Sequence, residues 1–140
     1  MTYTVIPNQN ENFVHLRCAG DLTLAQMTSA WRRVQQVLAK WEWKRILIDI
    51  TALQKGPDTA ELFDLAKLFW CHFPHRGRMA LVVRWEQSTL AKLLETLLRN
   101  FGVYLTVFVS KEVAKAWIVE DLPKAASIPV AQIAVKCGAI

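Results

Sequence analysis

The chain has 140 residues, which is the length of one ordinary domain. Hydrophobic residues make up 53% of it and charged residues 21%, a folding composition that excludes intrinsic disorder and collagen. The formal net charge of +5 is modest for a domain that binds nucleic acid, so we expect no nucleic-acid partner.

The cysteine and hydropathy patterns indicate a protein of the reducing cytoplasm. Cys18, Cys71 and Cys137 are too few and too far apart for a disulfide framework, and no charged start followed by an apolar run marks a secretory signal. The longest wholly apolar runs are far shorter than the roughly 20 residues that cross a bilayer. We therefore expect a soluble, cytoplasmic protein without a membrane span.

Two short β-prone runs, residues 3–7 and 13–20, are separated by a polar five-residue connector and predict an antiparallel hairpin. Side chains in the second run must alternate between the two faces of the sheet. One face should hold Val14, Leu16 and Cys18, and the other Phe13, His15 and Arg17.

After Asp21 the hydrophobic period changes to about 3.6 and predicts a helix that ends near Trp41, with Thr23 and Gln26 at capping-box spacing. Residues 44–50 are apolar on both faces, which is typical of a central strand covered by helices on each side. Residues 51–57 are expected to form a loop. Asp58 and Glu61 then repeat the capping-box spacing at the start of a second helix, which Pro74 ends.

The alternation of strands and helices continues to residue 119. Residues 79–83 and 103–109 predict two further strands, and a leucine-rich helix between them begins near Ser88 and stops at Gly102. Ser110 can cap a last helix over residues 111–119. The order ββαβαβαβα predicts an α/β domain with a mixed, mostly parallel sheet of about five strands and four helices. The core should contain Trp31, Ile46, Ile48, Leu65, Leu81, Val83, Leu94 and Val107.

Three segments of this framework resemble the SpoIIAA-like, STAS-like family of bacterial domains. They are residues 44–51 (KRILIDIT), 78–83 (RMALVV) and 107–118 (VFVSKEVAKAWI), and the last is similar to the closing "vF…eA…WL" signature of that family. The resemblance covers about residues 3–122 and implies a STAS-like regulatory or signalling module that binds protein. We therefore expect a SpoIIAA-like domain over residues 1–123 and a C-terminal extension, residues 124–140, that lengthens the sheet or packs on another subunit.

STAS-type anti-sigma-factor antagonists have an Asp-Ser-Ser-Gly turn before the second helix, and a partner kinase phosphorylates a serine there. The corresponding stretch here runs from Gly56 to Glu61. Asp58 and Thr59 lie near the right place, but Ala60 replaces the second hydroxyl and Glu61 replaces the glycine. Thr59 is therefore either a phosphoacceptor or a first-turn residue behind an Asp58 N-cap.

In a parallel sheet the functional crevice lies outside the carboxyl ends of the strands. The predicted topology places Asp58 and Thr59 at that edge, together with Arg84 and Trp85, which directly follow the strand at residues 79–83. Trp85 satisfies no core periodicity, so it either anchors a helix or is an exposed contact. We expect these four residues to bind a protein partner or to regulate its binding.

The other patterns favour no catalytic, metal or cofactor site. The chain has no Gly-rich phosphate loop, nucleophile elbow or paired carboxylates within one loop, so we expect neither an enzyme nor a cofactor. The reactive cluster at residues 71–78 lacks the ligand spacing for zinc, because Pro74 breaks its helical geometry. Its basic residues and their neighbours are expected to form a solvated edge that contains Lys67, Arg76, Arg78 and Arg84.

The alternative function is a carrier of a small apolar or lipid-like ligand. The leucine stripe at residues 90–98 would line a pocket between helices and sheet, together with Trp31, Trp41, Phe69 and Trp70. Such a stripe is also what any helix packed on a sheet requires. The many aromatic residues and the mean hydropathy of +0.18 favour a homo-oligomer, for which a dimer is the commonest form.

Overall fold

The computed structural model describes residues 2–73 and 77–120. Five strands form one sheet in the order β1-β2-β3-β4-β5. Their bounds are β1 Tyr3–Asn8, β2 Phe13–Asp21, β3 Arg45–Lys55, β4 Arg78–Val82 and β5 Tyr104–Phe108. β1 pairs antiparallel with β2, whereas the other neighbours are parallel, so the predicted mixed sheet is confirmed.

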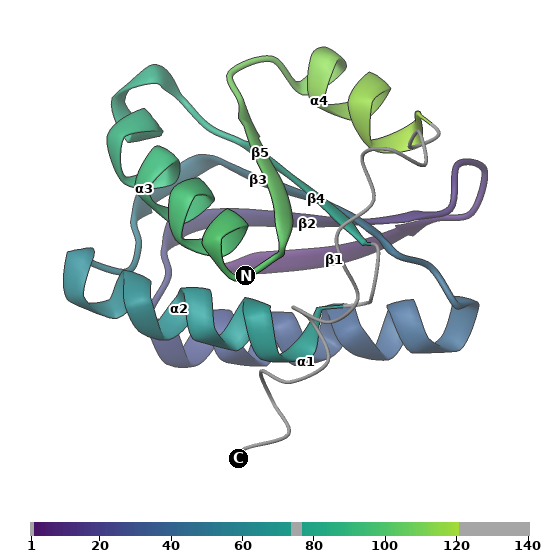
Figure 1. Cartoon of the computed structure of the whole chain (residues 1–140), viewed down its shortest axis with the longest axis horizontal. Helices are drawn as coiled ribbons and strands as arrows, with labels where there is room; N and C mark the ends of the chain where they lie inside the picture. Colours follow the sequence, from purple (N-terminus) through teal and green to yellow (C-terminus); the bar gives the residue numbers. More distant parts are fainter. Residues whose placement is uncertain (1, 74–76, 121–140) are drawn as a thin grey trace.

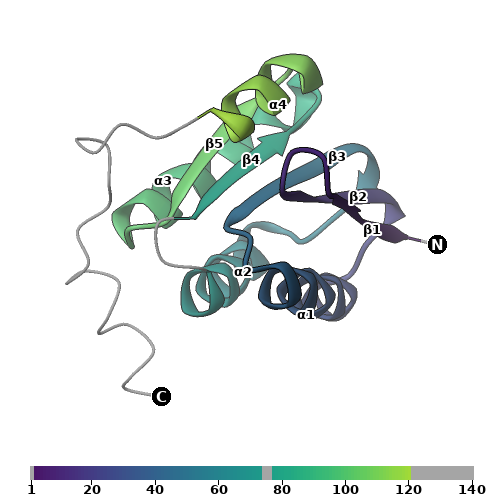
Figure 2. The same cartoon turned by 90° about the vertical axis from the view of Figure 1, so that its right-hand side faces the viewer.

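Four helices of the described chain cover this sheet on both faces (Figure 1). They are α1 Leu24–Trp41, α2 Thr59–His72, α3 Ser88–Asn100 and α4 Lys111–Val119, and a short 3-10 helix, η1 Trp85–Gln87, leads into α3. α1, α2 and α3 lie on one face, and α4 lies on the other (Figure 2). The predicted α/β fold with four helices is confirmed.

The helix starts follow the predicted capping residues. Thr23 and Gln26 form a capping box at α1, and the Ser110 hydroxyl accepts a hydrogen bond from the Val113 N–H at α4. These side chains satisfy N–H groups that have no partner within the helix, and each contributes about 1 kcal/mol. After α3, Gly102 has a φ of 87°, the left-handed conformation that glycine adopts without steric cost.

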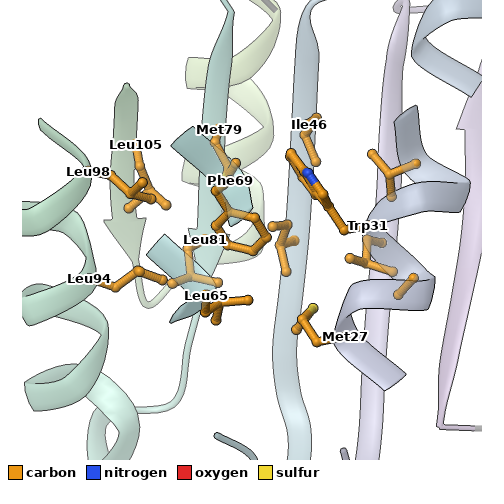
Figure 3. Close-up of a cluster of buried hydrophobic side chains, with 14 of the residues drawn as sticks. Met27, Trp31, Ile46, Leu65, Phe69, Met79, Leu81, Leu94, Leu98 and Leu105 are labelled. Atoms are coloured by element: carbon orange, nitrogen blue, oxygen red, sulfur yellow. The ribbon is translucent and has the colours of Figure 1, made fainter. Parts of the chain in front are cut away.

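The larger hydrophobic core lies between the sheet and the three helices α1, α2 and α3 (Figure 3). Trp31 and Phe69 meet at its centre, with their rings 4.5 Å apart. A smaller core lies under α4 and includes Phe13 and Leu47. Because β3 sends Ile46 into the larger core and Leu47 into the smaller one, it is the two-sided central strand that its sequence predicted.

The predicted alternation in β2 is confirmed, since Val14, Leu16 and Cys18 face the larger core and Phe13 faces the smaller one. All the predicted core residues are buried except Val107, which is partly buried. Val107 lies on β5, the edge strand of the sheet, where no further described strand covers its open side.

β3 is longer than its sequence predicted. Residues 51–55, which we expected to form a loop, continue the strand to Lys55. They pair with the carboxyl end of β2, where Ala19 is opposite Ala52 and Gly20 is opposite Leu53. The register shifts there, so the pairing follows an irregular path that alternation of apolar residues does not reveal.

Arg78 is not part of a solvated basic edge, contrary to expectation, because its side chain is buried. Its Nη1 donates to the Trp117 carbonyl oxygen at 2.6 Å, and its guanidinium lies 5.2 Å from the centre of the Trp117 ring. The last carbonyls of a helix have no partner within the helix and attract cations. Arg78 therefore fastens the end of α4 to the start of β4.

Several expectations lie outside the described residues. These are the C-terminal extension, residues 124–140, and Pro74, Arg76 and His75 of the reactive cluster. Among the residues that the structure does describe, no helix is both long and apolar enough to span a membrane.

Two phenylalanines of α2 provide a matched test of the larger core. Phe69 is 2% exposed and Phe63 is 55% exposed. We predict that Phe69→Ala lowers the free energy of unfolding by about 3–5 kcal/mol, because it leaves a cavity. Phe63→Ala should change it by no more than about 0.5 kcal/mol. Urea unfolding followed by circular dichroism measures both, and equal losses would contradict this assignment of the two faces.

His15 predicts a dependence of stability on pH. Burial lowers the pKa of His15 below its usual value, Lys111 and Arg17 act in the same direction, and Asp49 opposes them. The unfolded chain then binds the proton more readily than the folded one, so stability should fall as pH drops below about 6.5. Urea midpoints of wild type and His15→Gln above and below that pH measure the effect. A loss of the same size in both proteins would show that His15 is not its source.

Candidate partner-binding site

The carboxyl ends of β3, β4 and β5 meet at one edge of the sheet, because the three strands are parallel neighbours. Asp58 is the N-cap of α2 and Thr59 is its first residue, while Arg84 and Trp85 follow β4 at the start of η1. All four residues of the predicted site therefore lie at this edge, which we call the C-terminal edge.

Arg84 ties the loop after β4 to the end of β3. Its Nη1 donates hydrogen bonds to the carbonyl oxygens of Thr51 and Leu53, the latter at 3.0 Å. Its Nε lies 3.7 Å from a carboxylate oxygen of Glu86. These contacts hold the guanidinium in one place at the surface, next to the exposed Trp85.

Gln87 makes a second set of hydrogen bonds between this loop and the end of β3, which sequence reasoning missed. Its Nε2 donates to the carbonyl oxygens of Ile50 at 2.9 Å and Leu53 at 3.2 Å. Its Oε1 accepts from the backbone N–H of Arg84 at 2.8 Å. No sequence pattern predicts that a glutamine at a helix start will form hydrogen bonds with a strand more than thirty residues earlier.

At the start of α2 the capping box is complete. The Asp58 carboxylate accepts from the Glu61 N–H at 2.8 Å, and the Glu61 carboxylate accepts from the Asp58 N–H at 3.1 Å. Thr59 is exposed beside this box. The structure thus gives Asp58 the N-cap role and leaves the Thr59 side chain accessible from solvent.

Trp85 is exposed and does not anchor a helix, because its side chain is 78% accessible to solvent. Other large hydrophobic side chains are exposed at the same edge, on the early turns of α2, α3 and α4 and just after β5: Phe63, Leu90, Val113 and Val109. The remaining exposed ones in the described ranges, Ile6, Trp41 and Phe101, lie on β1 and at the far ends of α1 and α3. The C-terminal edge therefore carries most of the large exposed apolar side chains that the structure describes.

A pocket of about 330 Å³ opens at the C-terminal edge, and Leu90 is the member of this exposed set that lines it. Its floor contains Ile48 and Leu81 of the sheet, and α1, α2 and α3 supply apolar walls. Figure 3 labels five of its lining residues, which extend across the sheet from Met27 on α1 to Leu94 on α3: Met27, Leu65, Phe69, Leu81 and Leu94. Its mouth is polar and includes Gln54, Arg84, Glu86 and Gln87.

The pocket differs in part from the one expected for a carrier. Phe69, Leu90 and Leu94 line it as expected. Trp31 instead fills the core against Phe69, Trp41 stacks on Trp43, and Trp70 stacks on Phe101. Sequence reasoning also missed Gly56, where a Cβ atom would lie 2.8 Å from the Leu53 side chain, so that a larger residue would require this side chain of the pocket wall to shift.

Asp49 and Cys18 are buried ionisable residues of the described chain, and both have structural surroundings. The Asp49 carboxylate accepts hydrogen bonds from the Thr51 N–H at 2.9 Å and the Thr51 hydroxyl at 2.6 Å, and so orders the end of β3. Burial raises the pKa of the Cys18 thiol to about 12, which keeps it protonated and unreactive. Within residues 2–73 and 77–120, no group of three or more His, Cys, Asp or Glu side chains could hold a metal ion.

The hydrogen bonds made by Arg84 predict that its substitution changes backbone dynamics locally. Arg84→Ala removes two hydrogen bonds to the end of β3, so residues 51–55 should exchange their amide hydrogens faster while the rest of the sheet does not. Glu86→Ala is the matched control, because Glu86 contacts the Arg84 side chain from solvent. Hydrogen–deuterium exchange with mass spectrometry measures this, and unchanged exchange at residues 51–55 would contradict the role of Arg84.

Comparison with known proteins shows which fold and family this architecture matches. No curated protein sequence matches the chain. A solved structure of an uncharacterised protein of the DUF3478 family, with a SpoIIAA-like fold, from Shewanella loihica PV-4 is similar with a TM-score of 0.57 and 21% identity over 83% of this chain and 91% of that one. The model of the SpoIIAA-like family matches residues 13–119. This match runs from β2 to the end of α4, and the chain belongs to the SpoIIAA-like family.

Proposed function

We propose that this chain is a non-catalytic regulatory module that binds a protein partner through its C-terminal edge. The observation that carries the proposal is the exposed Trp85 beside the mouth of an apolar pocket. Membership of the SpoIIAA-like family supports a STAS-like module, and the site on this chain is argued from its own residues.

The physical chemistry of the edge suits a protein surface. Tryptophan is enriched among the few residues that dominate binding energy at protein interfaces, and such residues pair with pockets that partner side chains fill. Leu90 is exposed and lines the pocket, and the exposed Phe63 directly follows Leu62, which also lines it. The hydrogen bonds of Arg84 and Gln87 fix the loop that carries Trp85, so less conformational entropy is lost on binding.

Thr59 is the residue through which this binding would be regulated. Its hydroxyl lies at the N-terminus of α2, where backbone N–H groups and the helix dipole favour an added phosphate. The Asp58 carboxylate beside it repels that phosphate and competes for the same N–H groups. A phosphate on Thr59 would therefore add negative charge to the C-terminal edge. It would at the same time weaken the N-cap of α2.

A carrier of a small apolar ligand is the second candidate function, and the pocket itself is the observation that favours it. A volume of about 330 Å³ lies within the range of small-molecule sites, and its walls are apolar with polar groups at the mouth. Ala91 lines this pocket, so Ala91→Leu would fill part of it. Native mass spectrometry of protein purified from its native bacterium tests for a bound small molecule that Ala91→Leu loses.

The partner-binding proposal predicts which substitutions abolish capture. Tagged wild type and variants are used to isolate partners from the native bacterium, and the strongest partner is then purified for titration. We expect Trp85→Ala and Phe63→Ala each to weaken binding by at least about tenfold, typical for loss of an aromatic anchor. Trp41→Ala, an exposed tryptophan at the opposite edge, is the control and should bind as wild type does.

Two results of this experiment would contradict the proposed site. One is unchanged affinity for both edge variants, and the other is an equal loss in the Trp41→Ala control. Mass spectrometry of the chain isolated in the same experiment shows whether Thr59 is phosphorylated. If Thr59 is phosphorylated in no growth condition, it has no regulatory role. The titrations then test the binding edge by themselves.

A further inference from the structure

A second hollow lies at the opposite edge of the sheet, between the carboxyl ends of α1 and α2. It is a groove of about 610 Å³. Its apolar walls are Leu38, Ala39, Trp43 and Phe73, and its polar margin includes Glu42, Lys44 and Cys71. Trp43 stacks at 5.4 Å on Trp41, which is 40% exposed, so the aromatic surface continues out of the groove.

The two helices that form the groove are joined across it. The Gln35 side-chain amide donates a hydrogen bond to the His72 carbonyl oxygen, which connects α1 to the end of α2. At the groove margin the Arg78 N–H donates to the Lys44 carbonyl oxygen at 2.9 Å. A Cβ atom on Gly77 would lie 2.7 Å from the Phe73 ring, so the close packing beneath the groove requires glycine. The groove is thus a built feature with a fixed floor.

The described chain ends near the same edge of the sheet as this groove, but on the opposite face, where α4 lies. Arg45 donates from Nη1 to the carbonyl oxygen of Val119, the last residue of α4, at 3.3 Å. Arg45 directly follows Lys44, which lines the groove. At roughly 3.3 Å per residue, the seven residues 121–127 can span about 23 Å, which is ample to pass from the end of α4 round the edge of the sheet.

The sequence that follows has the chemistry to fill an apolar groove. Residues 125–135, Ala-Ala-Ser-Ile-Pro-Val-Ala-Gln-Ile-Ala-Val, contain no charged side chain, and Lys124 and Lys136 flank them. Ile128, Val130 and Ile133 match the apolar walls of the groove. A tethered segment also has an effective concentration in the millimolar range, which favours its own groove over that of a second copy.

We propose that residues 128–135 of this same chain dock in the groove between the carboxyl ends of α1 and α2. The docked segment covers Trp43 and Phe73 and closes the edge of the domain that lies opposite the partner-binding edge. This intrachain contact is independent of the proposed function, because it uses the other end of the helices.

The chain's own cysteines test this placement. Cys71 lies at the groove and Cys137 lies two residues beyond the proposed segment, whereas Cys18 is buried with a raised pKa and serves as an internal control. Brief treatment with diamide oxidises two neighbouring thiols to a disulfide as the diamide is reduced to its hydrazine. We expect a Cys71–Cys137 disulfide in the monomer, identified by peptide mapping without reductant.

A matched pair of variants makes the result specific. Ile133→Asp places a charge inside the proposed segment, and Ser127→Asp places the same charge just before it. Ile133→Asp should slow the cross-link by about tenfold, a loss typical of a disrupted apolar contact, and Ser127→Asp should not. Amide exchange at residues 38–44 and 71–73 should also rise in Ile133→Asp and not in Ser127→Asp.

Three outcomes overturn the proposal. A Cys71–Cys137 disulfide found only in the mass range of a dimer would place the segment on a second copy. Equal cross-linking rates in the two variants would show that the disulfide reports chance collisions. Unchanged amide exchange around the groove in Ile133→Asp would show that the segment does not cover it, whether or not a cross-link forms.

Discussion

Burial of β3 on both faces is the constraint on which the rest of this domain depends. Ile46 and Ile48 point into the larger core and Leu47 into the smaller one, so helices must cover both sides of the strand. α1 and α2 are the crossover connections on either side of β3 and pack on one face, while α4 covers the other (Figures 1 and 2). This arrangement sends every helix start after β3 to the same edge of the sheet and thereby gathers the candidate site there.

The candidate site combines a rigid frame with an exposed tip. β3 continues to Lys55, past the end of its pairing with β4 at Asp49, and the side chains of Arg84 and Gln87 hydrogen-bond to carbonyl groups in this extension. Trp85 lies between these two anchored residues and is left in solvent. Trp85 and the other exposed apolar side chains of this edge are gathered as they are at protein interaction sites, and we propose binding here for that reason.

The sequence was sufficient where structure follows from local pattern. The capping boxes at Thr23 and Asp58, the alternation in β2 and the two-sided strand at Ile46–Ile48 all depend on residues close together in the chain, and all are confirmed. Three sets of contacts between distant residues were not predicted. The extension of β3, the burial of Arg78 against Trp117 and the ties from Gln87 join segments that are more than thirty residues apart. For Trp85 the sequence left open whether the side chain anchors a helix or is exposed, and only the packing in the folded structure decides between the two.

The central claim, that a protein partner binds the C-terminal edge, is tested most directly by following backbone amide signals of the isotope-labelled chain while unlabelled partner is added. The account predicts that the largest chemical-shift changes fall at residues 56–63 and 84–91, around Trp85 and the mouth of the pocket. Signals of residues 38–44, at the opposite edge, should remain in place. Changes confined to that opposite edge, or to the open strand β1, would contradict the claim.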